Sequence, residues 1–476
     1  MVLPRQLLVL FAITLGTLGH AAPASEAPGH RVTYPAPGAK DVPPDTPLRL
    51  TLNTAPRPGM SGEIRIVEAD SGAIVETIDV AAPVKLRTLG GEPNYRYHAF
   101  LVAGDEITVT PAPGTLGHGK TYRVEIDPAV TGAPAQPWTF TTRAKPVPGG
   151  KTHLVVAADG GGDFATLQGA LDYVPTGNTV PTTITLRRGV YREVVFFTDK
   201  HALTIRGEDR KATVLEYPNN DWFNPSNGNP FGGTQPNPVA ARPGGNIYHR
   251  GVFLAHRASD LTVTTLTVRN TTPPGGSQAE TIILNGTVDA RARLLHLDLF
   301  STQDTLQVNG QAYVEDCYVE GDVDFLWGKG PAFFRDCTFR ALRSDAYYTQ
   351  VRNPQDHHGF VFVHCAFVGA PGVTGNYLSR IGTGRFPHSE VVLVDCTLGA
   401  AVHPVGWLYS GGREGNENDP AQVRFWEFNS RDEQGQPVDT SQRRQGSRRL
   451  DAKADAEVIR QYRDAGFVLG RWEPGK

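Results

Sequence analysis

The chain has 476 residues, with 46 lysines and arginines against 49 aspartates and glutamates and a formal net charge of −3 at pH 7. This balance, without long basic runs, argues against nucleic acid as a partner. The length allows two or three domains. The 52 glycines and 37 prolines are spread throughout, as is typical of a β protein rich in turns.

The first 21 residues are predicted to be a secretory signal peptide. Arg5 precedes the apolar run LLVLFAITLGTLG, and Gly19-His20-Ala21 places small residues at positions −3 and −1 of a cut after Ala21. The apolar run is shorter than the ~20 residues that a membrane-spanning helix needs. We therefore expect a secreted protein, extracellular or periplasmic, with no membrane partner.

Residues 28–143 are predicted to form a small β-sandwich. The segments ITVTPAPGTLGHGKTYRVEI and PWTFTTR contain alternating strands at the spacing of a sandwich. The phrases at 116–122 and 138–142 resemble bacterial Ig-like modules of secreted enzymes. No residue of the module suggests catalysis, so we expect a spacer or docking role, with carbohydrate binding as the alternative, and activity that does not need it. Residues 144–150 are predicted to be a Pro/Gly-rich linker.

Residues 151–476 are predicted to form the second domain. It opens with a strand at 154–157, a glycine-rich turn and a helix at 164–174. The glycines are not followed by the motifs of phosphate-binding loops. We interpret the helix as a cover for the first edge of a β structure, which would otherwise invite aggregation. Glu193, in GVYRE, is expected to be a structural partner.

Residues 216–250 are polar and show no strand pattern. They include the aromatic residues Trp222, Phe223 and Phe231. Long inserts of this kind are either functional or surface loops. Both interpretations stay open, the functional one being that these rings stack on sugar faces.

Short strands recur in the second half of the chain. Apolar runs surround Leu297, Cys317, Cys337, Cys365 and Cys396, at spacings of 20, 20, 28 and 31 residues. Such intervals without helical patterns predict a β-solenoid, a coil that stacks on itself. The four cysteines share one strand position and are expected to be small core residues. A disulfide between Cys317 and Cys337 fits the coil spacing and stays open.

Asp304 and Asp324 lie 20 residues apart, each seven residues after Leu297 or Cys317. Equivalent positions of successive coils are about 4.8 Å apart, so the two carboxyl groups would be neighbours. Adjacent carboxylates repel, and one tends to stay protonated while the other ionises. This division suits chemistry that needs one acid and one nucleophile or base. A solvated row of aspartates is the alternative, and with Asp322 the group could also bind calcium.

Two motifs around these aspartates form a known pair. QDTL at 303–306 and GDVDFLWG at 321–328 resemble the paired signature of pectin methylesterases, over about residues 151–470. The resemblance implies an all-β fold with a right-handed parallel β-helix. It also implies that Asp304 is the general acid/base, Asp324 the nucleophile and Gln303 an oxyanion donor. Adjacent strand residues point to opposite faces, so Gln303 and Asp304 reach one site only if the chain bends there.

Two further catalytic residues follow from the resemblance. Gln278, in SQAETI, resembles the family glutamine that holds the oxyanion. Glu280 could take this place in a shifted register, but we prefer Gln278 because an amide can donate to a developing negative charge. Arg380, in YLSRIG, stands where the family has LGRPW and is expected to hold Asp324 ionised. Gly382 replaces the family tryptophan, which leaves the exact acyl substrate open.

We predict a secreted, monomeric esterase that removes methyl esters from galacturonate units of pectin, without cofactor or metal. Trp327, Tyr348 and Trp222 are expected to contact the substrate. A helix within RRLDAKADAEVIRQY is expected to cap the far end. The alternatives are a related esterase or thioesterase with another acyl substrate, a calcium-dependent protein like pectate lyase, and a polysaccharide-binding protein.

Overall fold

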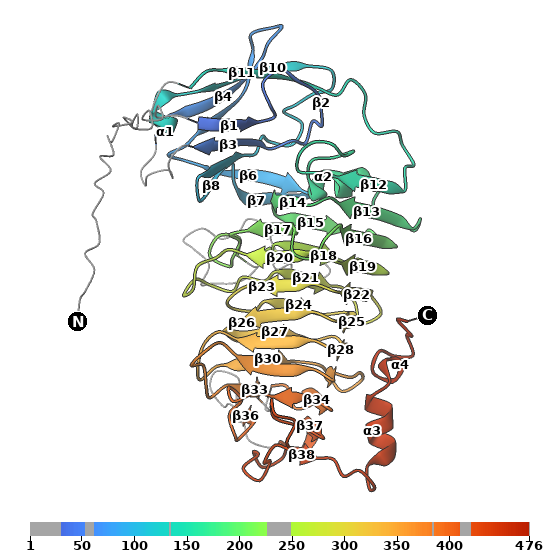
Figure 1. Cartoon of the computed structure of the whole chain (residues 1–476). Coiled ribbons are helices and arrows are strands. Elements are labelled where there is room, and N and C mark those ends of the chain that lie inside the picture. Colours follow the sequence, from blue (N-terminus) through green and yellow to red (C-terminus); the bar gives the residue numbers. More distant parts are fainter. Residues whose placement is uncertain are drawn as a thin grey trace, which may run out of the picture.

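The computed structural model describes residues 30–52, 61–132, 135–225, 249–382, 385–409 and 420–475. The predicted signal peptide and Phe231 lie outside the described residues. The structure is almost entirely β and dominated by long parallel sheets (Figure 1), which confirms the predicted fold class. No helix within the described ranges is long and apolar enough to cross a bilayer.

The N-terminal module contains two mainly antiparallel sheets that enclose one hydrophobic cluster, which includes Leu50, Ile66 and Val124. Alternating burial, as in Thr121–Ile126, turns one face of each strand inward. The first sheet contains β1 (His30–Tyr34), β3 (Leu48–Leu52), β9 (Glu106–Val109) and β8 (Phe100–Ala103). The second contains β2 (Ala39–Val42), β11 (Trp138–Thr142), β10 (Thr121–Ile126), β4 (Glu63–Glu68) and β5 (Ile74–Asp79), and α1 (Pro128–Thr131) follows β10. The Ig-like assignment and the domain boundaries stay predictions.

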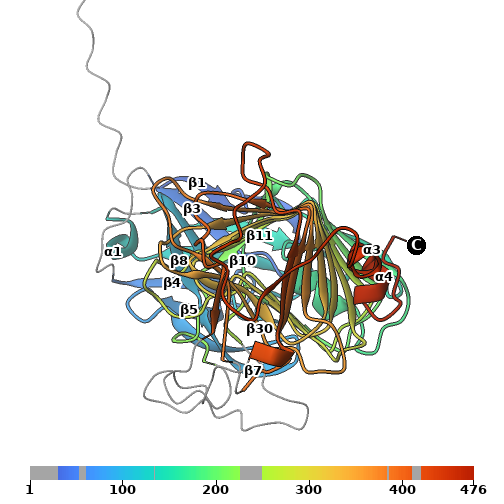
Figure 2. The same ribbon diagram turned by 90° about the horizontal axis from the view of Figure 1, so that it is seen from below.

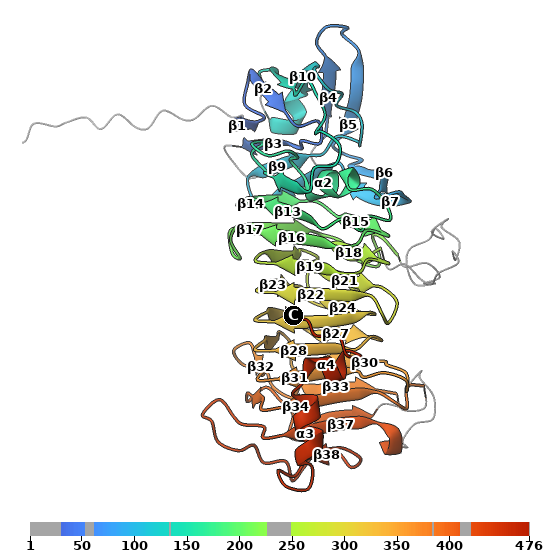
Figure 3. The same ribbon diagram turned by 90° about the vertical axis from the view of Figure 1, so that its right-hand side faces the viewer.

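A separate hairpin, β6 (Val84–Leu89) and β7 (Glu92–His98), extends from this module onto the second domain (Figures 1 and 3). Leu89, Tyr95 and Tyr97 belong to the hydrophobic core of the second domain, not to that of their own module. The turn at Gly90 packs so closely that a Cβ there would overlap the carbonyl oxygen of Phe196. The sequence pattern did not indicate this contact.

The second domain is a parallel β-helix in which each complete coil gives one strand to each of three sheets. The first sheet contains β12 (His153–Val156), β13 (Thr182–Leu186), β16 (Leu203–Gly207), β19 (Leu261–Thr264), β22 (Arg291–Leu295), β25 (Gln311–Glu315), β28 (Ala332–Arg335), β31 (Phe360–Val363), β34 (Glu390–Val394), β37 (Arg424–Phe428) and β38 (Arg448–Arg449). The second contains β14 (Gly189–Arg192), β17 (Thr213–Tyr217), β20 (Thr267–Asn270), β23 (Asp298–Phe300), β26 (Tyr318–Gly321), β29 (Thr338–Ala341), β32 (Ala366–Gly369) and β35 (Thr397–Leu398). The third contains β15 (Val195–Thr198), β18 (Phe253–His256), β21 (Ile282–Asn285), β24 (Leu306–Val308), β27 (Val323–Gly328), β30 (Tyr347–Val351), β33 (Tyr377–Ile381) and β36 (Trp407–Tyr409).

One turn of the coil explains the cysteine spacing. A residue with φ between 47° and 56° precedes each buried position, and Asn, Asp and His are the side chains that tolerate this left-handed region. These residues are His296, Asp316, Asp336, His364, Asp395 and Asn429. Each of the first five is followed by one of the stacked core residues identified from the sequence. All four cysteines are buried and free, so the structure does not contain the Cys317–Cys337 disulfide.

The helices cover two different surfaces of the β-helix. α2 (Leu167–Tyr173) packs on β12 and β15 at the first coil, as expected, and Glu193 accepts hydrogen bonds from the N–H groups of Leu167 and Gln168 (2.8 and 2.9 Å) at its N-terminus. The expectation of a C-terminal cap is wrong. α3 (Ala456–Tyr462) and α4 (Ala465–Val468) lie along the outside of the first sheet (Figure 2), because that face carries an apolar row that they bury, including Phe333 and Val361.

Candidate active site

Three carboxyl groups occupy equivalent positions of successive coils on the third sheet. Ile282 pairs with Leu306, and Leu306 with Leu326, and each of Glu280, Asp304 and Asp324 lies two residues before its paired residue. Backbone hydrogen bonds from Ala279 to Gln303 and from Asp304 to Val323 continue this register. Asp304 and Asp324 are thus neighbours, and Glu280 extends the row. We call these three residues the acidic ladder.

The chain bends at both aspartates. Asp304 has φ +64° and Asp324 φ +48°, in the left-handed region that few side chains other than Asn and Asp adopt. Strain of this kind tends to gather at functional sites. The bend removes the alternation that would send Gln303 and Asp304 to opposite faces, and the joint placement of the two side chains in one site stays a prediction.

Arg380 holds the Asp324 end of the ladder. Its Nε donates to Asp324 Oδ1 at 3.3 Å, and its Nη2 donates to Oδ2. Gln350 Nε2 also donates to Asp324 Oδ2 at 3.3 Å, and Arg352 in turn donates to Gln350. The Arg380 guanidinium lies over the ring of Tyr347, 4.7 Å from its centroid. A two-point contact with an arginine favours the ionised form of a carboxyl group.

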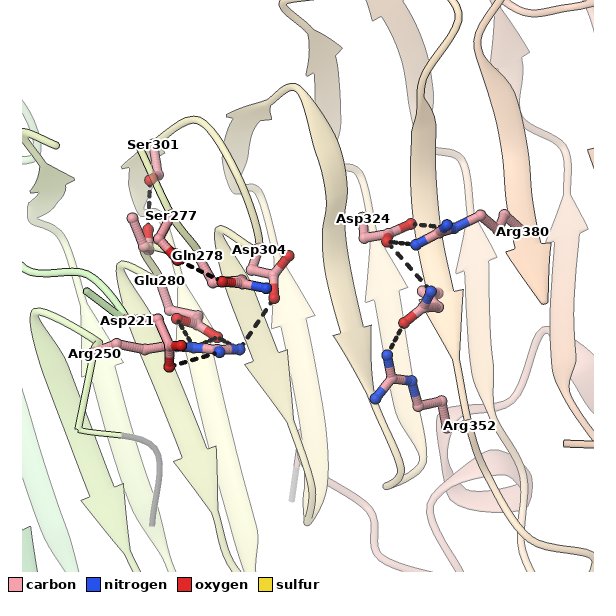
Figure 4. A network of polar contacts seen from close by, with 12 residues as sticks. Asp221, Arg250, Ser277, Gln278, Glu280, Ser301, Asp304, Asp324, Arg352 and Arg380 are labelled. Atoms are coloured by element: carbon pink, nitrogen blue, oxygen red, sulfur yellow. Dashed lines mark hydrogen bonds and ion pairs between the residues drawn. The ribbon is translucent and has the colours of Figure 1, made fainter. Parts of the chain in front are cut away.

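Arg250 holds the other end of the ladder (Figure 4). Its Nε lies 2.9 Å from both carboxyl oxygens of Glu280, and its Nη2 donates to Glu280 at 2.8 Å and to Asp304 Oδ2 at 3.1 Å. Its Nη1 donates to Asp221 at 3.2 Å. Burial disfavours the charge on Arg250, but the Glu280 and Asp304 carboxyl groups outweigh it and raise the pKa of the guanidinium.

Burial raises the pKa of Asp304 well above its ordinary value. The negative charges of Glu280 and Asp324 raise it further, whereas Arg250 and Arg352 lower it. Burial also raises the pKa of Glu280, against the pull of Arg250. Both shifts favour the protonated form of these carboxyl groups, which suits Asp304 to act as an acid.

Gln278 lies beside this end of the ladder. Ser277 Oγ donates to Gln278 Oε1 at 2.6 Å, and Figure 4 shows the Gln278 side chain pointing toward Asp304. The backbone carbonyl of Gln278 accepts the N–H of Asp221 (2.9 Å). An N–H donor at this place fits the oxyanion role expected of Gln278, while Glu280 serves as the partner of Arg250.

The three predicted substrate-binding aromatic residues differ in their surroundings. Trp327 is buried, with 4% of its surface exposed, and the Arg250 and Arg352 guanidinium groups lie 5.6 and 5.2 Å from the centroid of its ring. Trp222 is 57% exposed and follows Asp221. Tyr348 requires a correction: it is fully buried, and its hydroxyl donates to Val368 O at 2.7 Å. The pleat of β30 turns Tyr348 inward and leaves its neighbour Tyr347 beside Arg380.

Asp322 does not join the ladder. Its carboxyl group lies 3.9 Å from Arg343, and burial raises its pKa. Among the residues that the structure describes, no group of three or more His, Cys, Asp or Glu side chains is placed to hold a metal ion.

Several residues of the site escaped the sequence analysis. Asp221, Arg250 and Gln350 belong to no motif that we recognised, and Glu280 entered only as a register alternative. The spacing of Glu280 and Asp304 contained a usable signal, since 24 residues are also one coil here. No such signal pointed to Arg250, because this residue ends the 216–250 insert, which shows no strand pattern.

Comparisons with known proteins identify relatives of the β-helix. The family model described as Pectinesterase matches residues 153–225 and 240–469. Pectinesterase 31 of Arabidopsis thaliana is 29% identical over 280 residues, which are 57% of this chain and 80% of the relative. Pectinesterase 2 of Olea europaea is 28% identical over 325 residues, 67% of this chain and 79% of the relative.

Solved structures show the same fold. A pectin methylesterase from carrot superposes with a TM-score of 0.54 at 19% identity, over 69% of this chain and 95% of the other. Pectin methylesterase PemA from Erwinia chrysanthemi gives 0.52 at 19% identity, over 67% and 97%. Fold and family model together define a carboxylic ester hydrolase built on a parallel β-helix. The chain belongs to the pectinesterase family, whose members remove methyl esters from pectin, and the predicted family and enzyme class are confirmed.

Proposed function

We propose that the chain demethylates pectin with Asp324 as nucleophile and Asp304 as general acid and base. The observation that carries this division of roles is the distribution of arginines along the ladder. Asp324 has the two-point contact of Arg380, whereas Asp304 shares Arg250 with Glu280 and Asp221. The first arrangement favours a carboxylate, and the second favours a retained proton.

In the first half of the reaction, a carboxylate oxygen of Asp324 attacks the carbonyl carbon of the methyl ester. The negative charge moves to the former carbonyl oxygen, where amide donors of Gln278 and Gln303 stabilise it. Collapse of this intermediate breaks the bond to the methoxy group, and Asp304 gives it a proton, so that methanol leaves. The galacturonate acyl group is then joined to Asp324 as an anhydride.

In the second half, Asp304 is ionised and takes a proton from water as the water attacks the galacturonate carbonyl. The anhydride bond breaks, Asp324 recovers its carboxylate and the galacturonate acid group is released. Asp304 ends protonated, as it began. Each step uses residues of the ladder and the two glutamines, and none requires a cofactor.

The relatives support pectin as the substrate, and the predicted signal peptide supports a setting outside the cytoplasm. One similar solved protein is a pectin methylesterase in complex with a hexasaccharide, at 19% identity and a TM-score of 0.52, which supports a polysaccharide chain as substrate. Trp222, which is 57% exposed, is the aromatic residue proposed to contact it, whereas Trp327 is 4% exposed and offers the chain little surface. The protein acts outside the cytoplasm as a monomer, after removal of residues 1–21.

Methanol release from highly methylated pectin, with and without excess EDTA, tests the reaction. Chelator-resistant release is expected. Release that disappears with EDTA and returns only with calcium would contradict the proposed mechanism, while hydrolysis of other esters or thioesters but not pectin would favour the related-esterase alternative. Acid quenching during turnover, followed by mass spectrometry of the peptide that contains Asp324, should detect the galacturonate acyl group on that residue. A single turnover that releases methanol without this adduct would favour direct attack by water.

A further inference from the structure

Arg250 is held by a network that leads away from the β-helix. Asn219 is fully buried, and its Nδ2 donates to His249 O at 2.8 Å and to Gly251 O at 2.7 Å. Both residues adjacent to Arg250 are thereby tied to one side chain. The position of Arg250, and with it the contact to Asp304, therefore depends on where Asn219 is held.

Asn219 is connected to the N-terminal module through Asn224. Asn224 Nδ2 donates to Asn219 Oδ1 at 2.8 Å and to the backbone carbonyl of Arg96 at 3.0 Å, and its Oδ1 accepts the Arg96 N–H at 2.9 Å. The Asn224 side-chain amide thus bonds both backbone groups of Arg96 on β7, as the backbone of a neighbouring strand would. Arg96 Nη1 also donates to Phe223 O at 3.2 Å, and the ring of His98 stacks on Phe223 at 4.3 Å.

A second connection reaches Arg250 from the other side. The ring of Tyr95, also on β7, meets the ring of His249 edge-on, with centroids 4.7 Å apart. Glu92 Oε1 lies 3.6 Å from His249 Nε2, and both side chains are 3% exposed. The hairpin therefore contacts residues 219–224 and the residue immediately before Arg250.

We propose that the β6–β7 hairpin of the N-terminal module completes the active site by fixing Arg250, which acts as a positioning residue for Asp304. This inference rests on the proposed role of Asp304 as acid and base. It reverses our expectation that residues 28–143 are not needed for activity. The module is then part of the catalytic unit and no longer a spacer.

The consequence for catalysis follows from the charges that face Asp304. Arg250 and Arg352 lower its pKa, whereas Glu280 and Asp324 raise it in addition to burial. A displaced Arg250 would leave the carboxyl group less well oriented and harder to ionise. Turnover should therefore fall, and the alkaline limb of the pH profile, where Asp304 loses its proton, should move to higher pH.

The test uses the full-length protein and methanol release from methylated pectin across pH. Asn224→Ala removes the bridge between β7 and Asn219, and we expect kcat to fall about tenfold or more, with the alkaline limb shifted upward and KM changed less. Arg96→Ala removes only the side-chain bonds to Trp222 O and Phe223 O and should shift the limb in the same direction by less. Leu86→Ala is the matched control, because this hairpin residue is 65% exposed.

Circular dichroism and thermal unfolding establish that each variant is folded. If Asn224→Ala does not fold, Arg96→Ala, at a partly exposed position, supplies the measurement, and Arg96→Lys should restore part of the loss. Folded variants with the kcat and pH profile of the wild type would overturn the inference. A wild-type protein that releases no methanol would instead contradict the proposed function itself, so the two failures are distinguishable.

Discussion

Asp304 and Asp324 have the same side chain, the same left-handed backbone conformation and equivalent places in successive coils, yet the number of carboxyl groups that share an arginine with each differs. Arg250 forms ion pairs with three carboxyl groups, one of which is Asp304, whereas Arg380 forms its ion pair with Asp324. The Arg250 side chain is 7% exposed and that of Arg380 is 32% exposed. In a fold that repeats its geometry from coil to coil, the proposed division into acid and nucleophile therefore rests on the neighbours of each aspartate.

The largest effect is expected for Asp324→Asn. An amide has nearly the shape of the carboxylate but is not a nucleophile, so kcat should fall by at least about 10⁴-fold with the fold intact. Stopped assays with a methanol detector measure the loss, and thermal unfolding checks the fold. Asp322→Asn, two residues earlier and paired with Arg343, is the control and should keep activity. Substantial residual turnover in Asp324→Asn would assign the nucleophile elsewhere.

Asp304→Asn should be less severe and should leave a different signature. The variant cannot protonate methanol or activate water, and general acid–base catalysis contributes about 10² to 10⁴-fold. The alkaline limb of the pH profile should disappear while the acid limb stays, because only Asp324 still titrates. A complete profile with both limbs displaced together would show that the two aspartates do not divide the roles as proposed.

Arg380→Ala should make the surroundings of the two aspartates more alike. Without the cation, the Gln350 amide is left to oppose the neighbouring carboxyl group, so Asp324 would ionise at higher pH and the acid limb should move upward. We expect kcat/KM to fall about 10²-fold, equivalent to ~3 kcal/mol of transition-state stabilisation. Arg380→Lys, which keeps the charge without the planar fork, should recover the position of the limb more than the rate. An unmoved acid limb in the alanine variant would contradict the electrostatic role.

The repeating part of the molecule could be predicted from the sequence, and the non-repeating contacts could not. Cys317 and Cys337 report the coil length directly, and a constant coil length brings Asp304 next to Asp324. Arg380 was found through its motif. Arg250 and Asp221 lie in a segment with no periodicity, and the hairpin that supports them comes from more than 120 residues earlier. The prediction for Tyr348 was wrong for a local reason, since a shift of one residue along a strand moves a side chain from the exposed face of the sheet to the buried face.

Glu280→Gln should have the smallest effect and the most specific one. Glu280 raises the pKa of Asp304, and as long as Asp304 must be protonated to act as the acid, a lower pKa means that it loses its proton at lower pH. The alkaline limb should therefore move down, by about one pH unit, while kcat on the plateau stays within about tenfold. This shift is opposite to that expected for Asn224→Ala, because one variant removes a negative charge beside Asp304 and the other displaces a positive one. Glu320→Gln, on the second sheet and 3.9 Å from Arg340, is the control. If Glu280→Gln and the wild type had the same pH profile, Glu280 would not influence the pKa of Asp304. The contrast between the two aspartates would then rest on Arg380 alone.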